Sequence, residues 1–130
     1  MQYLLDTDWA IQTLKGSNAV FERVQELEPI GVAISAVTVA EIYDGVFGSA
    51  NREQDEREFR AFLSGHEVLP FDAEAARIFG QHRRRLRSLG LSIGDMDLLI
   101  GATAIQHDLI VLTNNVRHFE RIEGIAIESV

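Results

Sequence analysis

The chain has 130 residues, enough for one domain with a substantial hydrophobic core, and 46% hydrophobic and 25% charged residues are typical of an ordinary globular protein. No apolar run reaches membrane-spanning length, the first residues do not form a signal peptide, and the absence of cysteine excludes disulfides and thiolate metal sites, which favours a cytoplasmic location. A net charge of −8 argues against a broad basic surface for nucleic acid, although it leaves open an enzyme that meets nucleic acid through metal ions and one local arginine patch.

Short apolar stretches alternate with longer stretches of helical character along the whole chain. In chain order we expect a strand at 3–6, helices at 7–16 and 18–28, a strand at 31–35, helices at 36–47 and 51–65, a strand at 66–71, helices at 72–90 and within 92–105, and strands at 109–113 and 125–129. This alternation predicts a single α/β domain over residues 1–130, with a mostly parallel five-stranded sheet between helices.

Polar side chains occur at four places that should share one edge of this sheet. They are Asp6 at the end of the first strand, Glu41 in the first turns after the second strand, Asp97 at the start of the helix that leads into the fourth strand, and Thr113–Asn115 at the end of that strand. The carboxyl ends of parallel strands lie at a common edge, where active sites of open α/β sheets form. We therefore expect these side chains to converge.

Clustered carboxylates repel one another unless cations neutralise them. Oxygen ligands without cysteine or a histidine pair favour Mg²⁺ or Mn²⁺ over zinc. Two such ions, about 3.5–4 Å apart, would activate water and stabilise the leaving oxygen in phosphodiester hydrolysis. The acids thus predict a metal-dependent hydrolase.

Each acid also has a purely structural interpretation. Asp6 could cap the following helix, Glu41 completes a capping box with Thr38, and Asp95 is well placed as an N-cap. Asp97 would gain only about 0.3–1 kcal/mol from the helix dipole, which explains an exposed acid better than one beside an apolar run. For Asp95 the capping role is favoured.

Four stretches, "YLLDTDWAI", "ISAVTVAEIYDGV", "IGDMDLLIGATAI" and "IVLTNNVRHFERIEGIAI", resemble the ordered motifs of PIN-domain ribonucleases, and more narrowly of VapC toxins. The resemblance covers essentially the whole chain. It implies a PIN-like three-layer α/β/α sandwich and an endoribonuclease that uses one or two Mg²⁺ or Mn²⁺ ions and leaves 5′-phosphate and 3′-hydroxyl ends. It also implies inhibition by a VapB-like antitoxin, a homodimer, and DNA binding only through the antitoxin.

The resemblance assigns roles to individual residues. Asp6, Glu41 and Asp97 match the three metal-binding acids of the family, and Asn115 falls at the fourth position, where many members carry aspartate. Thr7 and Thr113 match hydroxyl positions that orient the carboxylates. Asp8 stands where asparagine is more usual, so it either adds an acid to the site or caps the first helix. Asp95 stands where the family often has proline or another non-acidic residue, so we expect it to support the metal ligands without binding the metal itself.

The only dense basic cluster is "HRRRLR", residues 82–87. A solvated helix end is its simplest interpretation, and Arg83 is the one candidate for RNA contact. The other histidines, His66, His107 and His118, lack metal-ligand spacing and are expected at the surface.

Two other functions are weighed against the ribonuclease. The stretch "LLDTD" also resembles the nucleophile motif of haloacid-dehalogenase-like phosphatases, but these need a later lysine and the only lysine is Lys15. A degenerate PIN-like module for dimerisation or partner binding would lack activity, yet all three core acids are present.

Overall fold

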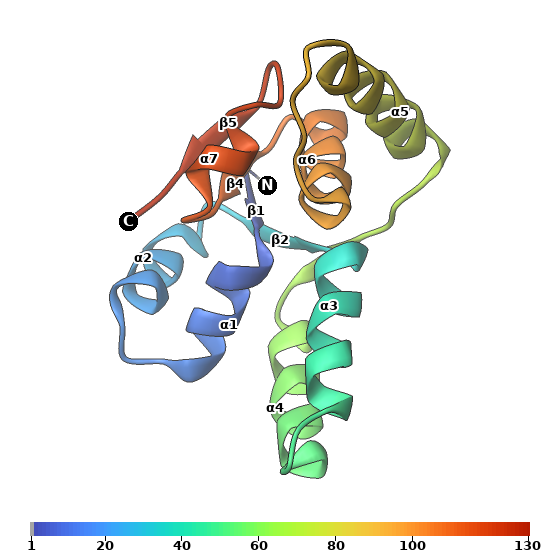
Figure 1. Cartoon of the computed structure of the whole chain (residues 1–130). Coiled ribbons are helices and arrows are strands. Elements are labelled where there is room, and N and C mark those ends of the chain that lie inside the picture. The colour runs from blue at the N-terminus through green and yellow to red at the C-terminus, as the bar shows by residue number, and fades with distance from the viewer. Residues whose placement is uncertain (1) are drawn as a thin grey trace.

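The strands form a central parallel sheet (Figure 1). The structure is a computed structural model that describes residues 2–130, and within this range five strands pair in parallel in the order β3-β2-β1-β4-β5. The strands are β1 (Tyr3–Leu5), β2 (Val32–Ser35), β3 (Glu67–Leu69), β4 (Ile110–Leu112) and β5 (Ala126–Glu128). In the middle, Leu5 of β1 is in register with Ile34 of β2 and Leu112 of β4. The carboxyl ends of these three strands therefore meet.

Helices fill the connections between the strands. They are α1 (Thr7–Lys15), α2 (Ala19–Leu27), α3 (Ala36–Phe47), α4 (Arg52–Ser64), α5 (Ala73–Ser88), α6 (Asp95–His107) and α7 (Val116–Phe119). The first six agree with the predicted helices. The short α7 was not predicted, because four residues are too few to show a helical period.

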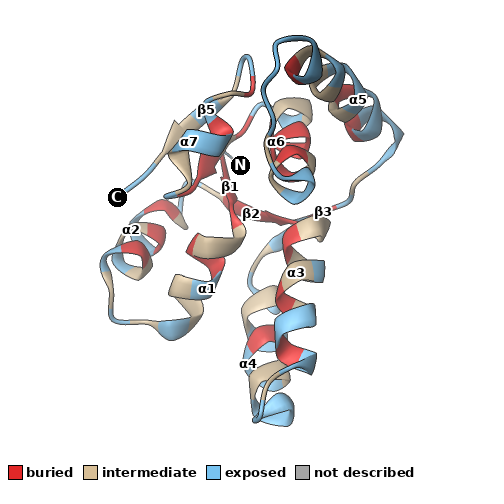
Figure 2. Cartoon of the chain, in the orientation of Figure 1, coloured by how far each residue is buried: buried red, intermediate tan, exposed pale blue. Residues whose placement is uncertain are grey.

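Each face of the sheet is covered by its own hydrophobic core (Figure 2). On one face Leu5 packs with residues of α1 to α4, including Trp9 and Phe59. On the other face Leu4 packs with residues of α5 to α7, including Phe119. Successive strand residues point to opposite faces, so both must be apolar in a sheet that is covered on both sides. The predicted three-layer α/β/α fold is confirmed.

The structure corrects two predicted helix caps. The Ser35 hydroxyl, not Thr38, caps α3 and accepts a hydrogen bond from the Thr38 amide at 3.0 Å, so the predicted capping box with Glu41 is wrong. Helix α6 is capped by Gly94 without a side-chain bond, so the predicted cap at Asp95 is also wrong. Asp95 is already the first helical residue, and a cap must precede the helix. Neither Glu41 nor Asp95 is explained by capping.

His66 is also placed differently from its predicted surface position. Its side chain is only 9% exposed, and its Nε2 lies 2.7 Å from Glu28 Oε1. The ring also stacks on Phe62. His66 therefore joins α2 to the end of α4.

Within residues 2–130, no helix has both the length and the apolar character that are needed to cross a bilayer.

Gly101 lets α6 pack closely on the segment after α7. A Cβ at this position would lie 2.5 Å from the Cδ1 atom of Ile122, a side chain that is 1% exposed. By contrast, a Cβ on Gly80 of α5 would have no atom within 4 Å. The glycine in α6 is thus explained by close packing and not by backbone conformation.

We expect Gly101→Ala to destabilise the protein by about 1 kcal/mol, because overpacking (about 1–3 kcal/mol) outweighs the gain in helix propensity (about 1 kcal/mol). Ile122→Val removes the Cδ1 atom that the new methyl group would meet. The free energy of unfolding of the double variant should therefore exceed, by about 1 kcal/mol, the value expected if the two single effects were additive. Urea unfolding measures both quantities. Gly80→Ala is the matched control and should stabilise; equal effects of the two alanines would contradict the packing explanation.

Candidate active site

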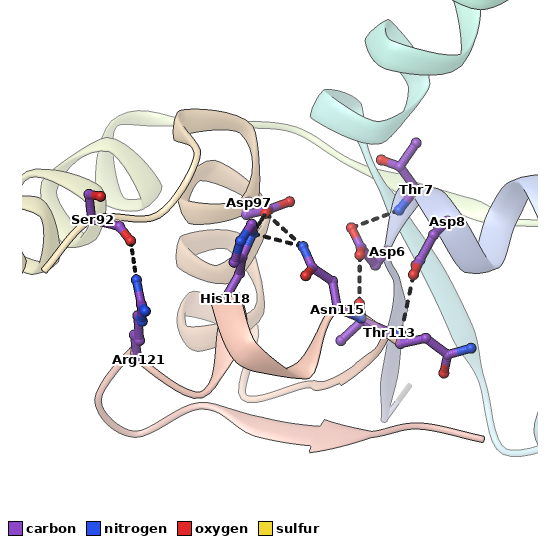
Figure 3. Close-up of polar contacts among 10 residues, drawn as sticks. Asp6, Thr7, Asp8, Ser92, Asp97, Thr113, Asn115, His118 and Arg121 are labelled. Carbon is purple, nitrogen blue, oxygen red and sulfur yellow. Dashed lines mark hydrogen bonds and ion pairs between the residues drawn. The ribbon is translucent and has the colours of Figure 1, made fainter.

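Asp6 is a buried acid at the carboxyl end of β1 (Figure 3). Its residue is 4% exposed, and both carboxylate oxygens are held by hydrogen bonds. Oδ1 accepts from the Thr7 amide at 2.8 Å, which also makes Asp6 the N-cap of α1. Oδ2 accepts from the hydroxyl of Thr113 at 2.7 Å. The first residue of α1 and the residue that follows β4 therefore fix this carboxyl group.

The surroundings of Asp6 favour its neutral form when no cation is bound. Burial is the main reason that the pKa of Asp6 is raised, from 3.8 to about 7. The hydrogen bond from Thr113 opposes this shift, and the charge of Asp8 adds to it. A buried acid of this kind gains most when a positive charge is placed beside it.

Glu41 reaches the same edge from the second turn of α3. Its Oε1 accepts a hydrogen bond from the Thr7 hydroxyl at 2.6 Å. Thr7 therefore contacts two acids, Asp6 through its amide and Glu41 through its side chain. Helix α3 begins directly after β2, and this short connection places Glu41 near the end of β1.

Asp97, in the first turn of α6, meets two side chains from the segment after β4 (Figure 3). Its Oδ2 accepts from Asn115 Nδ2 at 3.1 Å and lies 2.9 Å from His118 Nδ1. The side chain of Asp97 is 22% exposed and that of His118 is 46% exposed. The predicted surface position of His118 is confirmed, but no motif spacing signals its contact with Asp97.

The Thr113 hydroxyl joins these groups into one network. It donates to Asp6 and accepts a hydrogen bond from the Asn115 amide at 2.9 Å. Starting from α3, hydrogen bonds connect Glu41, Thr7, Asp6, Thr113, Asn115, Asp97 and His118, with two of the links made by the backbone amides of Thr7 and Asn115. The structure thus brings together the three acids and the three other residues that the motifs place with them.

The remaining candidate residues lie around this network. Asp8 accepts from the Trp9 amide at 2.7 Å and the Asn114 amide at 3.2 Å, so it ties α1 to the loop after β4. Asp95 is exposed and lies 3.6 Å from Arg83, whose guanidinium also stacks over Phe79. Neither member of this pair contacts the three acids through a hydrogen bond within residues 2–130.

The donor set fits a hard divalent cation in its chemistry. Within the described residues 2–130, no three acidic or histidine side chains are close enough to form a complete set of metal ligands. The acids nevertheless offer oxygen atoms only, which Mg²⁺ and Mn²⁺ prefer. The raised pKa of Asp6 marks a buried oxygen pair that a cation would stabilise in its ionised form.

The chain as a whole is similar to proteins of one family. The family model for the PIN domain matches residues 3–125. The chain is 33% identical to "Ribonuclease VapC2" of Rickettsia felis, over 99% of this chain and 98% of that protein. It is 35% identical to "tRNA(fMet)-specific endonuclease VapC" of Salmonella typhimurium, over 98% of this chain and 97% of that protein.

The fold is shared with a solved complex as well. The structure superposes on a chain of VapBC2 from Rickettsia felis, crystallised with a DNA fragment from its promoter, with a TM-score of 0.93 and 32% identity. The match covers 100% of this chain and 99% of that chain. Sequence and backbone therefore agree over the full length of the described chain.

Proposed function

The chain belongs to the PIN domain family, and from this premise we propose that it is a divalent-metal-dependent endoribonuclease of the VapC type that a VapB-like antitoxin inhibits. Its fold, its motif order and its relatives named as ribonucleases support the nuclease activity. One observation supports the metal-dependent part of the proposal. Hydrogen bonds link Glu41 and Asp97 to Asp6, whose buried carboxyl group has a raised pKa and would be stabilised in its ionised form by a cation.

The residues of the network have distinct tasks in this proposal. Asp6, Glu41 and Asp97 hold one or two divalent ions, and Asn115 assists beside Asp97. Thr7 and Thr113 orient the carboxylates, since their hydroxyls donate to Glu41 and Asp6. When bound, the metal makes water a better nucleophile and stabilises the charge that develops on the phosphate. The RNA 2′-hydroxyl takes no part.

Cleavage of RNA by the antitoxin-free protein tests this proposal. We expect cleavage in Mg²⁺ or Mn²⁺ and none in EDTA, with products that carry 5′-phosphate and 3′-hydroxyl ends. Total RNA is the first substrate, with initiator tRNA beside it because a relative is named for that tRNA. Cleavage that survives EDTA, or products with 2′,3′-cyclic phosphate ends, would contradict the metal-dependent reaction.

A cavity beside the network is a candidate binding site for the antitoxin. It has a volume of about 600 Å³ and lies between α1, α3 and α4. Its lining combines apolar side chains with three acids, one lysine and one glycine: Ile11, Leu14, Ile42, Val46, Phe59, Glu41, Asp55, Glu58, Lys15 and Gly45. Solved relatives are complexes of toxin with antitoxin. We therefore propose that an antitoxin segment with apolar and basic residues binds in this cavity. The homodimer that the resemblance implies is a separate prediction.

Ile11→Glu should separate inhibition from cleavage. Ile11 is 39% exposed in the cavity wall, so the change should spare the fold, whereas a charge in an apolar contact should weaken antitoxin binding by roughly 10–100-fold. Titration of RNA cleavage with a cognate VapB-like antitoxin measures the effect. Ile30→Glu, at a position that is 48% exposed and outside the cavity, is the control. Equal inhibition of both variants by the antitoxin would rule out this cavity as the antitoxin-binding site.

A further inference from the structure

His118 makes a direct contact with one of the proposed metal ligands. Its Nδ1 lies 2.9 Å from Asp97 Oδ2, and Asn115 Nδ2 donates to the same oxygen at 3.1 Å. His118 Nδ1 also lies 2.9 Å from Asn115 Nδ2, so its two contacts ask for opposite roles. A carboxylate oxygen only accepts hydrogen bonds, so Nδ1 carries the hydrogen whenever it bonds to Asp97, and Asn115 Nδ2 then donates to Oδ2 alone. Two donors thus converge on Oδ2, while Oδ1 receives no hydrogen bond from the described residues 2–130.

The backbone around His118 is held in place by its neighbours in the chain. Phe119 is fully buried in the core beneath α6, and this burial fixes the adjacent turn of α7. The guanidinium of Arg121 donates to the backbone oxygen of Ser92 at 2.6 Å (Figure 3). The segment after β4 is therefore attached to α6 on one side and to the loop before α6 on the other, with His118 between these attachments.

We infer that His118 is a positioning residue for Asp97. Its Nδ1–H holds Oδ2, so that the carboxylate keeps one orientation and presents Oδ1 to a divalent cation. Hydrogen bonds of this kind to metal ligands are commonly worth 10–100-fold in metal affinity. The inference rests on the proposed function, since it requires that Asp97 binds a metal.

An ordinary surface ion pair is the competing explanation. Exposed ion pairs contribute little to stability, and a pair of this kind would leave the metal affinity of Asp97 unchanged when it is broken. The orientation of Asp97 distinguishes the two explanations, because only a positioning role requires a donor at the place of Nδ1. Asparagine offers such a donor, since its Nδ2 is attached at the same position as Nδ1 in histidine. Alanine offers none.

Calorimetric titration of the antitoxin-free protein with Mn²⁺ tests the inference. We expect His118→Ala to weaken Mn²⁺ binding by roughly 10–100-fold and His118→Asn to stay within about threefold of the natural protein. His107→Ala removes another exposed histidine, at the far end of α6, and should leave the affinity unchanged. The melting temperatures in EDTA should agree among the four proteins, because both histidines are at least partly exposed.

The outcomes separate this inference from the function on which it rests. Binding by the natural protein with the same affinity in His118→Ala overturns the positioning role and leaves the metal site intact. Equal weakening in His118→Asn and His118→Ala also overturns it, because the donor would then be irrelevant. If the natural protein binds no Mn²⁺, the metal site fails and the inference fails with it.

Discussion

Asp97→Asn should reduce the rate of RNA cleavage by at least about 100-fold, because even groups that only support a metal ligand are worth 10–100-fold. The neutral amide keeps the size of the side chain and can still accept from Asn115, so the fold should be unchanged. Only the negative charge and one oxygen ligand are lost. Single-turnover cleavage in saturating Mg²⁺ is the measurement.

Asp95→Asn is the matched control for this experiment. The two acids lie two residues apart at the start of α6, but Asp95 is 63% exposed and faces Arg83 instead of the network. Its loss removes an exposed ion pair, which contributes about 0–1 kcal/mol. Cleavage by Asp95→Asn should stay within about threefold of the natural rate. Equal losses in both variants would show that general negative charge, and not a ligand at Asp97, supports the reaction.

Asp6→Asn should abolish cleavage and at the same time stabilise the metal-free protein. The folded state raises the pKa of Asp6 from 3.8 to about 7, so ionised Asp6 is disfavoured by folding. The resulting loss of stability begins as pH rises above the unfolded pKa and is complete above the folded pKa. A shift of this size corresponds to at most about 4 kcal/mol at pH 8. Asparagine lacks the charge and should recover about 1–3 kcal/mol of this, since it also loses a hydrogen bond.

Thermal unfolding in EDTA at pH 5 and pH 8 measures this gain. The melting temperature of Asp6→Asn should exceed that of the natural protein by roughly 4–10 °C at pH 8, and by clearly less at pH 5. Added Mg²⁺ should stabilise the natural protein and not the variant. Asp44→Asn, which changes an exposed acid on α3, is the control and should leave the melting temperature nearly unchanged at pH 8. A gain that is the same at both pH values would contradict the burial of an ionisable Asp6.

Much of the fold could be predicted because its signals are local. The five strands are short apolar runs, and the helices carry period and caps, such as Asn18 before α2 and Asp72 before α5. The shared edge of Asp6, Glu41 and Asp97 followed from parallel topology. Asp6 comes directly after β1, Glu41 lies in the helix that follows β2, and Asp97 lies in the first turn of the helix that leads into β4.

Other features depend on contacts between distant segments, which no local pattern encodes. The contact of His118 with Asp97 needs the position of α7 against α6, and that position comes from the burial of Phe119. Gly101 is explained only by Ile122, which lies beyond β4 in the sequence. The capping box at Glu41 fitted the motif, but the chain enters α3 one turn earlier, at Ser35. Both Ser35 and Thr38 could cap a helix, and Ser35 is the cap because β2 ends there and α3 begins at the next residue.

Direct measurement of bound Mn²⁺ by electron paramagnetic resonance tests the central claim, that Asp6, Glu41 and Asp97 together hold a divalent ion. The natural protein and Asp95→Asn should both bind Mn²⁺, and Asp97→Asn should bind it at least about tenfold more weakly. If Asp97→Asn binds Mn²⁺ as tightly as the natural protein, the acids at this edge of the sheet do not form the metal site.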